Sequence, residues 1–209
     1  MNADDTSKLY IAAYNDVPVA FPTIMPNGLI VMHLPPFQTF PTLTSQNIVL
    51  REVLPEDIPD VLEISVYDGR PAADAAEALT MFQKIDQNYR DGNSVNWGIA
   101  DKTTNEVMGT CGFYRGFEDS IGELGCIMRP AFRGRGYMTE AMRAAMDFGF
   151  REMELTQIFA VTRTHNVKAM ALMDRLGFLR VNKENVFSGR LQEVLESLGD
   201  EQVLYVANG

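Results

Sequence analysis

The residues best suited to chemistry in this chain lie in one segment, RPAFRGRGYMTEAMR, at residues 129–143. Within it, Arg133-Gly134-Arg135-Gly136 places two glycines and two cations where a predicted strand gives way to a predicted helix. Glycine allows a sharp bend and carries no side chain that would hold a ligand away. The helix beyond it offers unpaired N–H groups and the positive end of its dipole. The segment therefore predicts an anion site, for which a diphosphate is the natural ligand.

Two other phosphate-binding motifs do not fit this segment. The dinucleotide fingerprint needs a third small residue, and counting from Gly134 and Gly136 that position falls on Thr139. The phosphate loop of nucleotide hydrolases needs Gly-Lys followed by Ser or Thr, which the segment lacks. The alternative without a ligand is an exposed turn whose arginines serve solubility. We favour the ligand site because strand, paired glycines, cations and amphipathic helix coincide.

The elements that must position this turn follow from hydrophobic spacing. Before it, we expect helices near residues 55–65 and 74–90 and strands at residues 47–53, 94–100, 107–114 and 121–128. After it, a helix is predicted from a core-facing stripe at Met138, Ala141, Met142, Ala145, Phe148 and Gly149. The remaining elements are strands at 157–162, 178–186 and 203–206 and helices at 166–176 and 188–198. This order predicts a single α/β or α+β domain with a mixed sheet.

The first 45 residues differ from the rest of the chain. Prolines at positions 18, 22, 26, 35, 36 and 41 separate short apolar pieces, which excludes a long helix and permits only short or edge strands. We therefore expect residues 1–45 to form an N-terminal extension with short strands, packed on the main domain or on a partner subunit. Residues 46–209 are expected to form the domain itself.

Composition limits the classes of function. A length of 209 residues with 46% hydrophobic content is enough to bury one full core. The formal net charge of −10 argues against a nucleic-acid-binding protein and favours cationic partners. No apolar run approaches the roughly 20 residues that span a bilayer, and the acidic start MNADDTSK does not resemble a signal peptide. Two cysteines make no disulfide scaffold, so a reducing cytoplasm is the expected location.

At this point the residues resemble the GNAT superfamily of acyl-CoA-dependent N-acetyltransferases, over about residues 46–209. The first motif of that family corresponds to Arg133, Gly136 and position 138. Its second motif, an asparagine that opens a helix ending in Leu-Gly-Phe, corresponds to Asn166 and Leu176–Phe178. The run from Glu123 through Ala141 is most similar to the branch that acetylates the N-termini of ribosomal proteins. The resemblance implies a mixed, mostly antiparallel central sheet flanked by helices.

The resemblance also implies acetyl-CoA as cosubstrate and no metal. It assigns the donor site to Cys126, Ile127, Met128, Arg133, Gly134, Arg135, Gly136, Tyr137, Met138, Thr139, Asn166 and Met173. Many members carry a tyrosine where Met173 stands, which serves as the acid for the leaving thiolate. Methionine cannot donate a proton, so that acid is absent or supplied elsewhere. Two histidines and two scattered cysteines likewise make no metal-binding set.

The acceptor side is less constrained by the sequence. Strand alternation puts Glu123 on the same face as Gly125 and Ile127, and the family uses glutamates on this strand as bases, directly or through water. The alternative is an exposed carboxylate at a strand end. A loop at 114–117 is expected near the site, where it could contact the acceptor. Cys111 and Cys126, on neighbouring strands, are interpreted as small buried apolar residues rather than as acyl-carrying nucleophiles.

The resulting hypothesis is direct acetyl transfer to a neutral amine, with main-chain N–H groups of residues 126–128 stabilising the oxyanion. An α-amine with a pKa near 8 is roughly a tenth neutral at pH 7, whereas a lysine with a pKa near 10.4 is almost fully protonated. A single candidate base and no tyrosine acid therefore favour an N-terminal α-amine. Two alternatives stay open, a small cationic amine as acceptor and a non-catalytic acyl-CoA-binding module. The protein is expected to be a monomer or a homodimer.

Overall fold

The computed structural model describes residues 33–67, 69–182 and 189–209. Its centre is an eight-stranded sheet in the order β1-β2-β5-β6-β7-β8-β10-β9. The strands are β1 Leu43–Thr44, β2 Ile48–Arg51, β5 Val95–Asp101, β6 Val107–Tyr114, β7 Ile121–Met128, β8 Gln157–Arg163, β9 Leu179–Val181 and β10 Gln202–Asn208. Neighbours pair in antiparallel fashion except β7 and β8, which are parallel. The predicted mixed, mostly antiparallel sheet is therefore confirmed.

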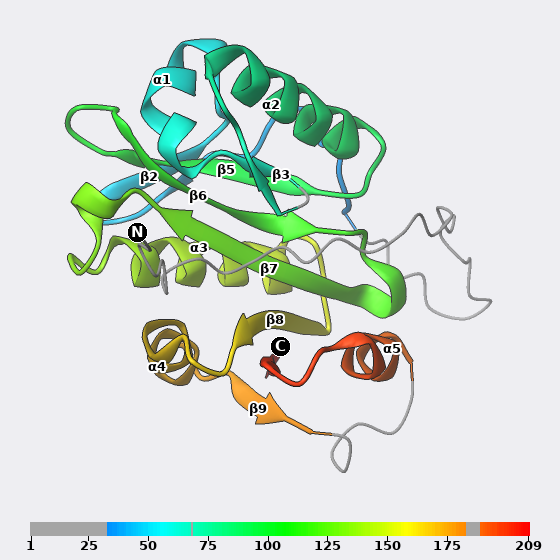
Figure 1. Ribbon diagram of the computed structural model, residues 1–209. Coiled ribbons are helices and arrows are strands. Elements are labelled where there is room, and N and C mark those ends of the chain that lie inside the picture. Colours follow the sequence, from blue (N-terminus) through cyan, green and yellow to red (C-terminus); the bar gives the residue numbers. More distant parts are fainter. Residues whose placement is uncertain (1–32, 68, 183–188) are drawn as a thin grey trace.

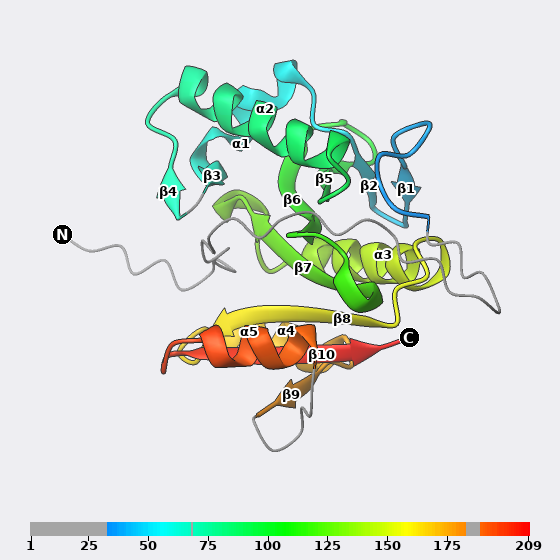
Figure 2. The same ribbon diagram turned by 90° about the vertical axis from the view of Figure 1, so that its right-hand side faces the viewer.

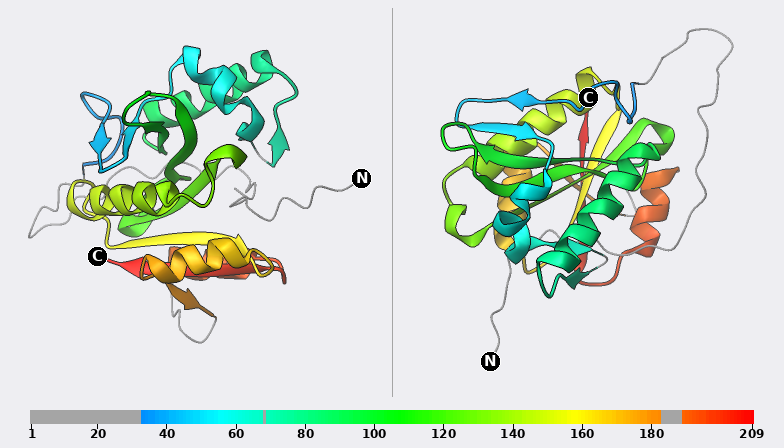
Figure 3. Two further views of the ribbon diagram at one scale, coloured as in Figure 1. Left: turned by 90° about the vertical axis from the view of Figure 1, so that its left-hand side faces the viewer. Right: turned by 90° about the horizontal axis from the view of Figure 1, so that it is seen from above.

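Five α-helices are described, α1 Ile58–Val61, α2 Ala75–Arg90, α3 Tyr137–Arg151, α4 Val167–Arg175 and α5 Arg190–Ser197. Short 3-10 turns at Pro55–Asp57, Leu62–Ile64, Glu118–Ser120 and Pro130–Phe132 complete the connections. α1 and α2 cover one face of the sheet and α3 and α4 the other, while α5 lies on the side of α1 and α2 (Figures 1, 2 and 3). No helix of the described residues combines the length and apolar character needed to span a bilayer.

The core follows from the predicted stripe of α3. Ala141, Met142, Ala145 and Gly149 are buried, and Met138 and Phe148 pack against the same cluster. Alternate residues of β5, β6 and β7 meet them, with Trp97, Phe113 and Leu124 all fully buried. A second apolar cluster lies between α5 and the other face of β8 and β10. The core thus fixes which face each β7 side chain occupies.

β7 and β8 separate after a short seam. Their pairing covers only Ile121–Glu123 on β7, which lie opposite Gln157–Phe159 on β8. Beyond this seam, β8 continues to pair with β10 as far as Arg163, and β7 continues to pair with β6 as far as Met128. The two strands therefore diverge from Glu123 onward, so that one edge of β7 is left without a strand partner in the sheet.

The described part of the N-terminal segment packs on the domain. Phe37 lies edge-on to Phe148 of α3, and Phe40 contacts the rings of Tyr89 and Trp97. The Tyr89 hydroxyl also accepts a hydrogen bond of 2.9 Å from the Phe37 N–H. Residues 33–45 are thereby attached to α2, α3 and β5. Residues 1–32 lie outside the described residues, and the predicted boundary at residue 45 stays a prediction.

Several elements differ from the sequence prediction. β1 is a short strand within residues 1–45, where short strands were expected. The small hairpin of β3 (Val66–Tyr67) and β4 (Arg70–Pro71) was not predicted, because two-residue strands carry no periodic signal. β9 ends at Val181, Asn182 is no longer in the strand, and the predicted positions 183–186 lie outside the described residues. β10 is longer than predicted and lies between β8 and β9, antiparallel to both.

Candidate functional site

The turn before α3 has the backbone that its glycines predicted. Gly134 and Gly136 both adopt left-handed conformations, with φ of 77° and 88°. A Cβ atom built on either residue would meet nothing within 4 Å, so both glycines border open space. α3 begins at Gly136 without a side-chain cap, whereas Asp74 caps α2 and Asn166 caps α4. The first N–H groups of α3 are therefore left for a ligand.

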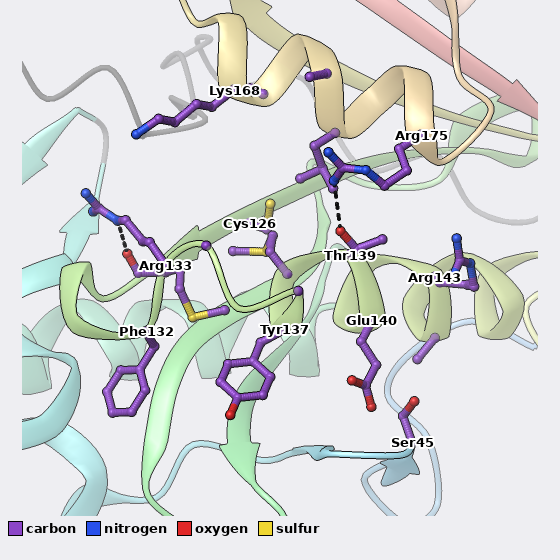
Figure 4. Close-up of a pocket in the computed structure, with 18 of the residues that line it drawn as sticks. Ser45, Cys126, Phe132, Arg133, Tyr137, Thr139, Glu140, Arg143, Lys168 and Arg175 are labelled. Carbon is purple, nitrogen blue, oxygen red and sulfur yellow. Dashed lines mark hydrogen bonds between the residues drawn. The ribbon is translucent and has the colours of Figure 1, made fainter.

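A cavity of about 1010 Å³ lies at this turn, between α3 and α4 (Figure 4). Among the residues predicted for the donor site, it is lined by Cys126, Met128, Arg133, Gly134, Gly136, Tyr137, Met138, Thr139 and Asn166. Three predicted donor-site residues do not line it. Ile127 packs on the α1–α2 side of the sheet, Arg135 stacks over the Phe132 ring at 5.7 Å, and Met173 is fully buried in the core. Their proposed contacts with the donor stay predictions.

Of the described residues, four cations line this cavity, together with the acids Glu140 and Asp147. Arg133 and Lys168 lie at one end, and Arg143 and Arg175 lie at the other (Figure 4). Arg175 Nη1 donates to Thr139 Oγ1 at 3.2 Å and so joins the end of α4 to the start of α3. Sequence reasoning named only Arg133 of these four. Helical spacing held a signal for Lys168 and Arg175, because residues seven apart share one face of a helix.

Arg129 does not belong to this cationic group. Its guanidinium donates to Glu63 Oε1 at 3.1 Å and to Glu106 Oε1 and the Val107 carbonyl, each at 2.8 Å. The side chain therefore ties the end of β7 to β6 and to the turn after α1. Its charge is paired with acids that are distant in the sequence, so Arg129 serves the fold rather than the cavity.

The main chain of β7 faces the gap at alternate residues. In an antiparallel pair, the N–H and C=O of one residue point to the same side, and the side alternates along the strand. Arg129 N–H donates to Met108 O at 2.9 Å, so it points toward β6. Met128 and Cys126 therefore point away from β6, and Met128 O accepts from Arg133 Nε at 2.9 Å. Ile127 points toward β6, so its N–H cannot serve an oxyanion in the gap.

Glu123 stands at the point where β7 and β8 part. It is the last β7 residue paired with β8, opposite Phe159, and it is 9% exposed. Register puts it on the α1–α2 side with Gly125 and Ile127, as predicted, and opposite to Cys126 and Met128. Arg115 Nη1 donates to Glu123 Oε2 at 2.5 Å. The carboxylate is thus buried and ion-paired, and it lies on the face of the sheet opposite to the cavity.

The predicted loop at 114–117 contributes unequally to this side. Tyr114 lies beside Glu123 on β6, and its hydroxyl donates to Asn96 Oδ1 at 2.7 Å. Burial raises the pKa of Tyr114 well above its usual value, so the phenol stays protonated at neutral pH. Phe117 is 6% exposed and packs on Phe113, with ring centroids 6.2 Å apart, so it belongs to the core.

The two cysteines lie directly opposite each other on β6 and β7, and both are free and buried. Burial raises the pKa of Cys126 to about 12 and that of Cys111 well above its usual value. Neutral thiols are poor nucleophiles. The interpretation as small apolar side chains is therefore favoured over a covalent acyl-cysteine, even though Cys126 lines the cavity.

These residues fit the diphosphate and the arm of a coenzyme A donor. The fit is carried by the open space over two left-handed glycines, the uncapped start of α3 and the four cations around the cavity. The main-chain groups of Cys126 and Met128 add hydrogen-bonding capacity along the gap. An amide-containing arm laid against β7 could use them as a neighbouring strand would.

Comparisons with known proteins agree with this geometry. A family model described as an acetyltransferase (GNAT) domain matches residues 47–179. An uncharacterized N-acetyltransferase p20 of Bacillus licheniformis is 31% identical over 146 residues, which cover 66% of this chain and 82% of the relative. Spermidine N(1)-acetyltransferase of Escherichia coli K12 is 34% identical over 56 residues, 27% of this chain and 30% of that protein. RimL, a ribosomal L7/L12 alpha-N-protein acetyltransferase in complex with coenzyme A, is similar in fold, with a TM-score of 0.66 at 16% identity over 80% of this chain and 98% of RimL.

Proposed function

The chain belongs to the GNAT acetyltransferase family, and on that premise we propose that it transfers the acetyl group of acetyl-CoA directly to an N-terminal α-amine of a protein or peptide. The family makes it an N-acetyltransferase, an acyltransferase that uses acetyl-CoA. The observation that carries the proposal is the meeting of two features. The cavity at the uncapped start of α3 adjoins the β7 main chain that the divergence from β8 leaves open.

The donor is held by the α3 side of the sheet in this proposal. The turn at Gly134–Gly136 and the first N–H groups of α3 bind the diphosphate, with Arg133 and Lys168 close to its charge. The pantetheine arm follows Cys126 and Met128 along β7. Asn166 faces it from the start of α4, where its Oδ1 also accepts from the Ala169 N–H at 3.1 Å.

The chemistry takes place at the open edge of β7, between the donor on the α3 side of the sheet and Glu123 on the α1–α2 side. A neutral amine attacks the thioester carbonyl carbon, the C–S bond breaks, and coenzyme A leaves as the thiolate. N–H groups directed into the gap stabilise the charge on the carbonyl oxygen, which is commonly the largest catalytic contribution. Among the predicted donors, the Cys126 N–H is suited to this role because it points into the gap nearer to Glu123. The Met128 N–H contacts the arm instead, and the Ile127 N–H points toward β6. From the opposite face, Glu123 accepts the proton that the ammonium form of the substrate loses before attack, and the second proton, released from nitrogen as the C–N bond forms, passes to the departing thiolate. Proton acceptance of this kind is worth roughly 10²–10⁴-fold in rate.

The acceptor preference rests on the proton balance. Glu123 is the one base in this scheme, and one of its oxygens already accepts a hydrogen bond from Arg115. A substrate that is partly neutral by itself suits such a site. An α-amine has a pKa near 8, roughly two units below that of a lysine. The similarity of the fold to RimL is consistent with this choice.

A small cationic amine is the second candidate. The net charge of −10 attracts polyamines through long-range electrostatics. The short but 34% identical match to a spermidine acetyltransferase favours the same substrate class. Nucleic acid as a partner is disfavoured by the charge. A protein N-terminus and a small cation can be told apart directly by experiment.

The deciding experiment is a thiol-release assay with acetyl-CoA and matched acceptors. One arm uses a peptide with a free α-amine and no lysine, and a second uses the same peptide N-acetylated and carrying one lysine. Spermidine and an aminoglycoside form the other arms. The proposal expects the highest kcat/KM with the free α-amine. Higher activity with spermidine would replace it by the second candidate, and acetyl-CoA binding without turnover on any amine would contradict both.

A further inference from the structure

α5 begins with a side chain that reaches the connection between β6 and β7. The Arg190 side chain is only 10% exposed. Its Nη2 donates to the Arg115 carbonyl at 2.6 Å, and its Nη1 donates to the Ile121 carbonyl at 2.8 Å. Nη1 also pairs with Glu118 Oε2 at 2.7 Å, and the Arg190 N–H donates to Asp119 Oδ2 at 3.3 Å. Arg190 therefore forms hydrogen bonds or an ion pair with the start, the middle and the end of this connection.

The connection that Arg190 grips has an unusual backbone. Arg115, Asp119 and Ser120 are not glycines, yet they adopt left-handed conformations with φ of 59°, 57° and 59°. This conformation is disfavoured for residues other than glycine, although less so for aspartate. Strained backbone persists only where its surroundings determine it strongly. The hydrogen bonds from Arg190 are well placed to do so, and its guanidinium is itself seated over the Phe159 ring at 5.6 Å.

The same connection carries the partner of the candidate base. Arg115 offers its carbonyl to Arg190 and its Nη1 to Glu123 Oε2. We propose that Arg190 is a positioning residue that fixes the Arg115–Ser120 connection and, through Arg115, the place of the Glu123 carboxylate. This inference rests on the proposed function, in which Glu123 acts on the acceptor amine. Arg190 itself touches neither substrate in this scheme.

The chain contains a matched control for this residue. Arg51 on β2 is 14% exposed and makes the same kinds of contact. Its Nη1 donates to the Glu52 carbonyl at 2.8 Å and pairs with Asp57 Oδ2 at 2.7 Å. Its Nη2 donates to the Asn105 carbonyl at 3.0 Å. Because β5 and β6 separate β2 from β7, loss of Arg51 removes comparable bonds without disturbing Glu123.

The experiment compares Arg190→Gln with Arg51→Gln, using the acceptor that gives the highest turnover. Thermal melting identifies a temperature at which both variants are folded, and kcat and both KM values are measured there. We expect R190Q to lower kcat/KM for the acceptor roughly tenfold or more, because small misplacements of catalytic groups are costly. KM for acetyl-CoA should change by less than about twofold. R51Q should change neither parameter by more than about twofold, and Arg190→Lys should recover part of the loss.

A double-mutant cycle shows whether Arg190 acts through Glu123. Combining R190Q with Glu123→Gln should add less than about twofold to the loss from E123Q alone. Losses that multiply, or an R190Q enzyme that behaves like R51Q, would overturn the inference while leaving the role of Glu123 intact. An E123Q enzyme with the wild-type rate would instead contradict the proposed role of Glu123, and the role of Arg190 would fail with it.

Discussion

The two ends of β7 are built in different ways. The last half, through Cys126 and Met128, offers main-chain groups to the gap and leads into a turn made of glycine and an uncapped helix. The first end presents Glu123, held by Arg115 and indirectly by Arg190 from α5. The donor end thus depends on backbone geometry encoded locally. The acceptor end depends on paired charged side chains, of which Arg190 comes from a segment 75 positions away from Arg115.

The largest effect is expected at the donor end from Gly136→Trp. The side chain would fill the open space over the turn and require a left-handed backbone, so coenzyme A binding should fall by more than about 100-fold. Titration calorimetry with coenzyme A measures the loss. Gly177→Trp is the control, because Gly177 has a φ of 81° and equally open surroundings after α4. Equal loss of binding in both variants would mean that strain, not occlusion of the donor, is responsible.

At the acceptor end, Glu123→Gln should lower kcat roughly 100-fold at pH 7 and leave coenzyme A affinity unchanged. The defect should shrink as the pH rises past about 8, because an α-amine is then neutral without a base. A pH profile of kcat/KM for wild type and variant measures this. Glu193→Gln removes an exposed carboxylate from α5 and serves as the control. A defect that stays constant up to pH 9.5 would argue against proton acceptance by Glu123.

Asn166 tests whether a residue of the donor end serves the fold, the ligand, or both. Asp caps helices as well as Asn does, so Asn166→Asp should keep the stability of α4 while replacing an amide donor by a negative charge. Coenzyme A affinity should fall roughly tenfold. Asn166→Ala should lose about 1 kcal/mol of stability in addition. Chemical denaturation and calorimetry separate the two effects, and unchanged affinity in both variants would restrict Asn166 to its cap.

The smallest effect is expected from Glu140, which attaches the turn before β2 to α3. Its carboxylate accepts from the Asn47 N–H at 2.7 Å and from Asn47 Nδ2 at 3.0 Å. Burial alone would raise the pKa of Glu140, but these hydrogen bonds outweigh burial and lower it. A lowered pKa in the folded state stabilises the protein above the unfolded pKa of about 4.3, and this contribution is lost as the pH falls through the folded value.

Glu140→Gln should therefore lower the melting temperature at pH 7 by roughly 2–4 °C, which corresponds to about 1 kcal/mol in a chain of this size. The difference from wild type should shrink progressively as the pH falls through the lowered pKa of Glu140, where the wild-type carboxyl becomes protonated as well. Calorimetric melting curves over a series of acid pH values provide the measurement. A difference that persists in acid would mean that packing, rather than the charge of Glu140, holds the turn.

Sequence reasoning succeeded where the signal was local. The stripe of α3, the cap at Asn166 and the alternation that places Glu123 with Gly125 all depend on neighbours within one or two turns or strands. The paired glycines predicted a turn that does adopt left-handed backbone. These features can be predicted without knowing which strands pair, because each depends only on the period of a single helix or strand.

The failures share one physical cause, which is dependence on long-range pairing. The end of the β7–β8 seam at Glu123 is set by register between strands separated by the whole of α3. The acids that hold Arg129, Glu63 and Glu106, are distant from it in sequence and were not predicted. The contact of Arg190 with Arg115 spans 75 positions and leaves no periodic trace. A charge can be located from sequence, whereas its partner cannot.

The short seam between β7 and β8 has a mechanical consequence. Three residue pairs between β7 and β8 join the two halves of the sheet. One half consists of β1, β2, β5, β6 and β7, and the other of β8, β10 and β9. A donor lying between Cys126 and the start of α4 would tie the half-sheets together across the open part of the joint. Its binding would therefore add to the resistance of the whole molecule to unfolding, in proportion to the logarithm of donor concentration. Acetyl-CoA would then stabilise the folded state as well as serve as a reactant.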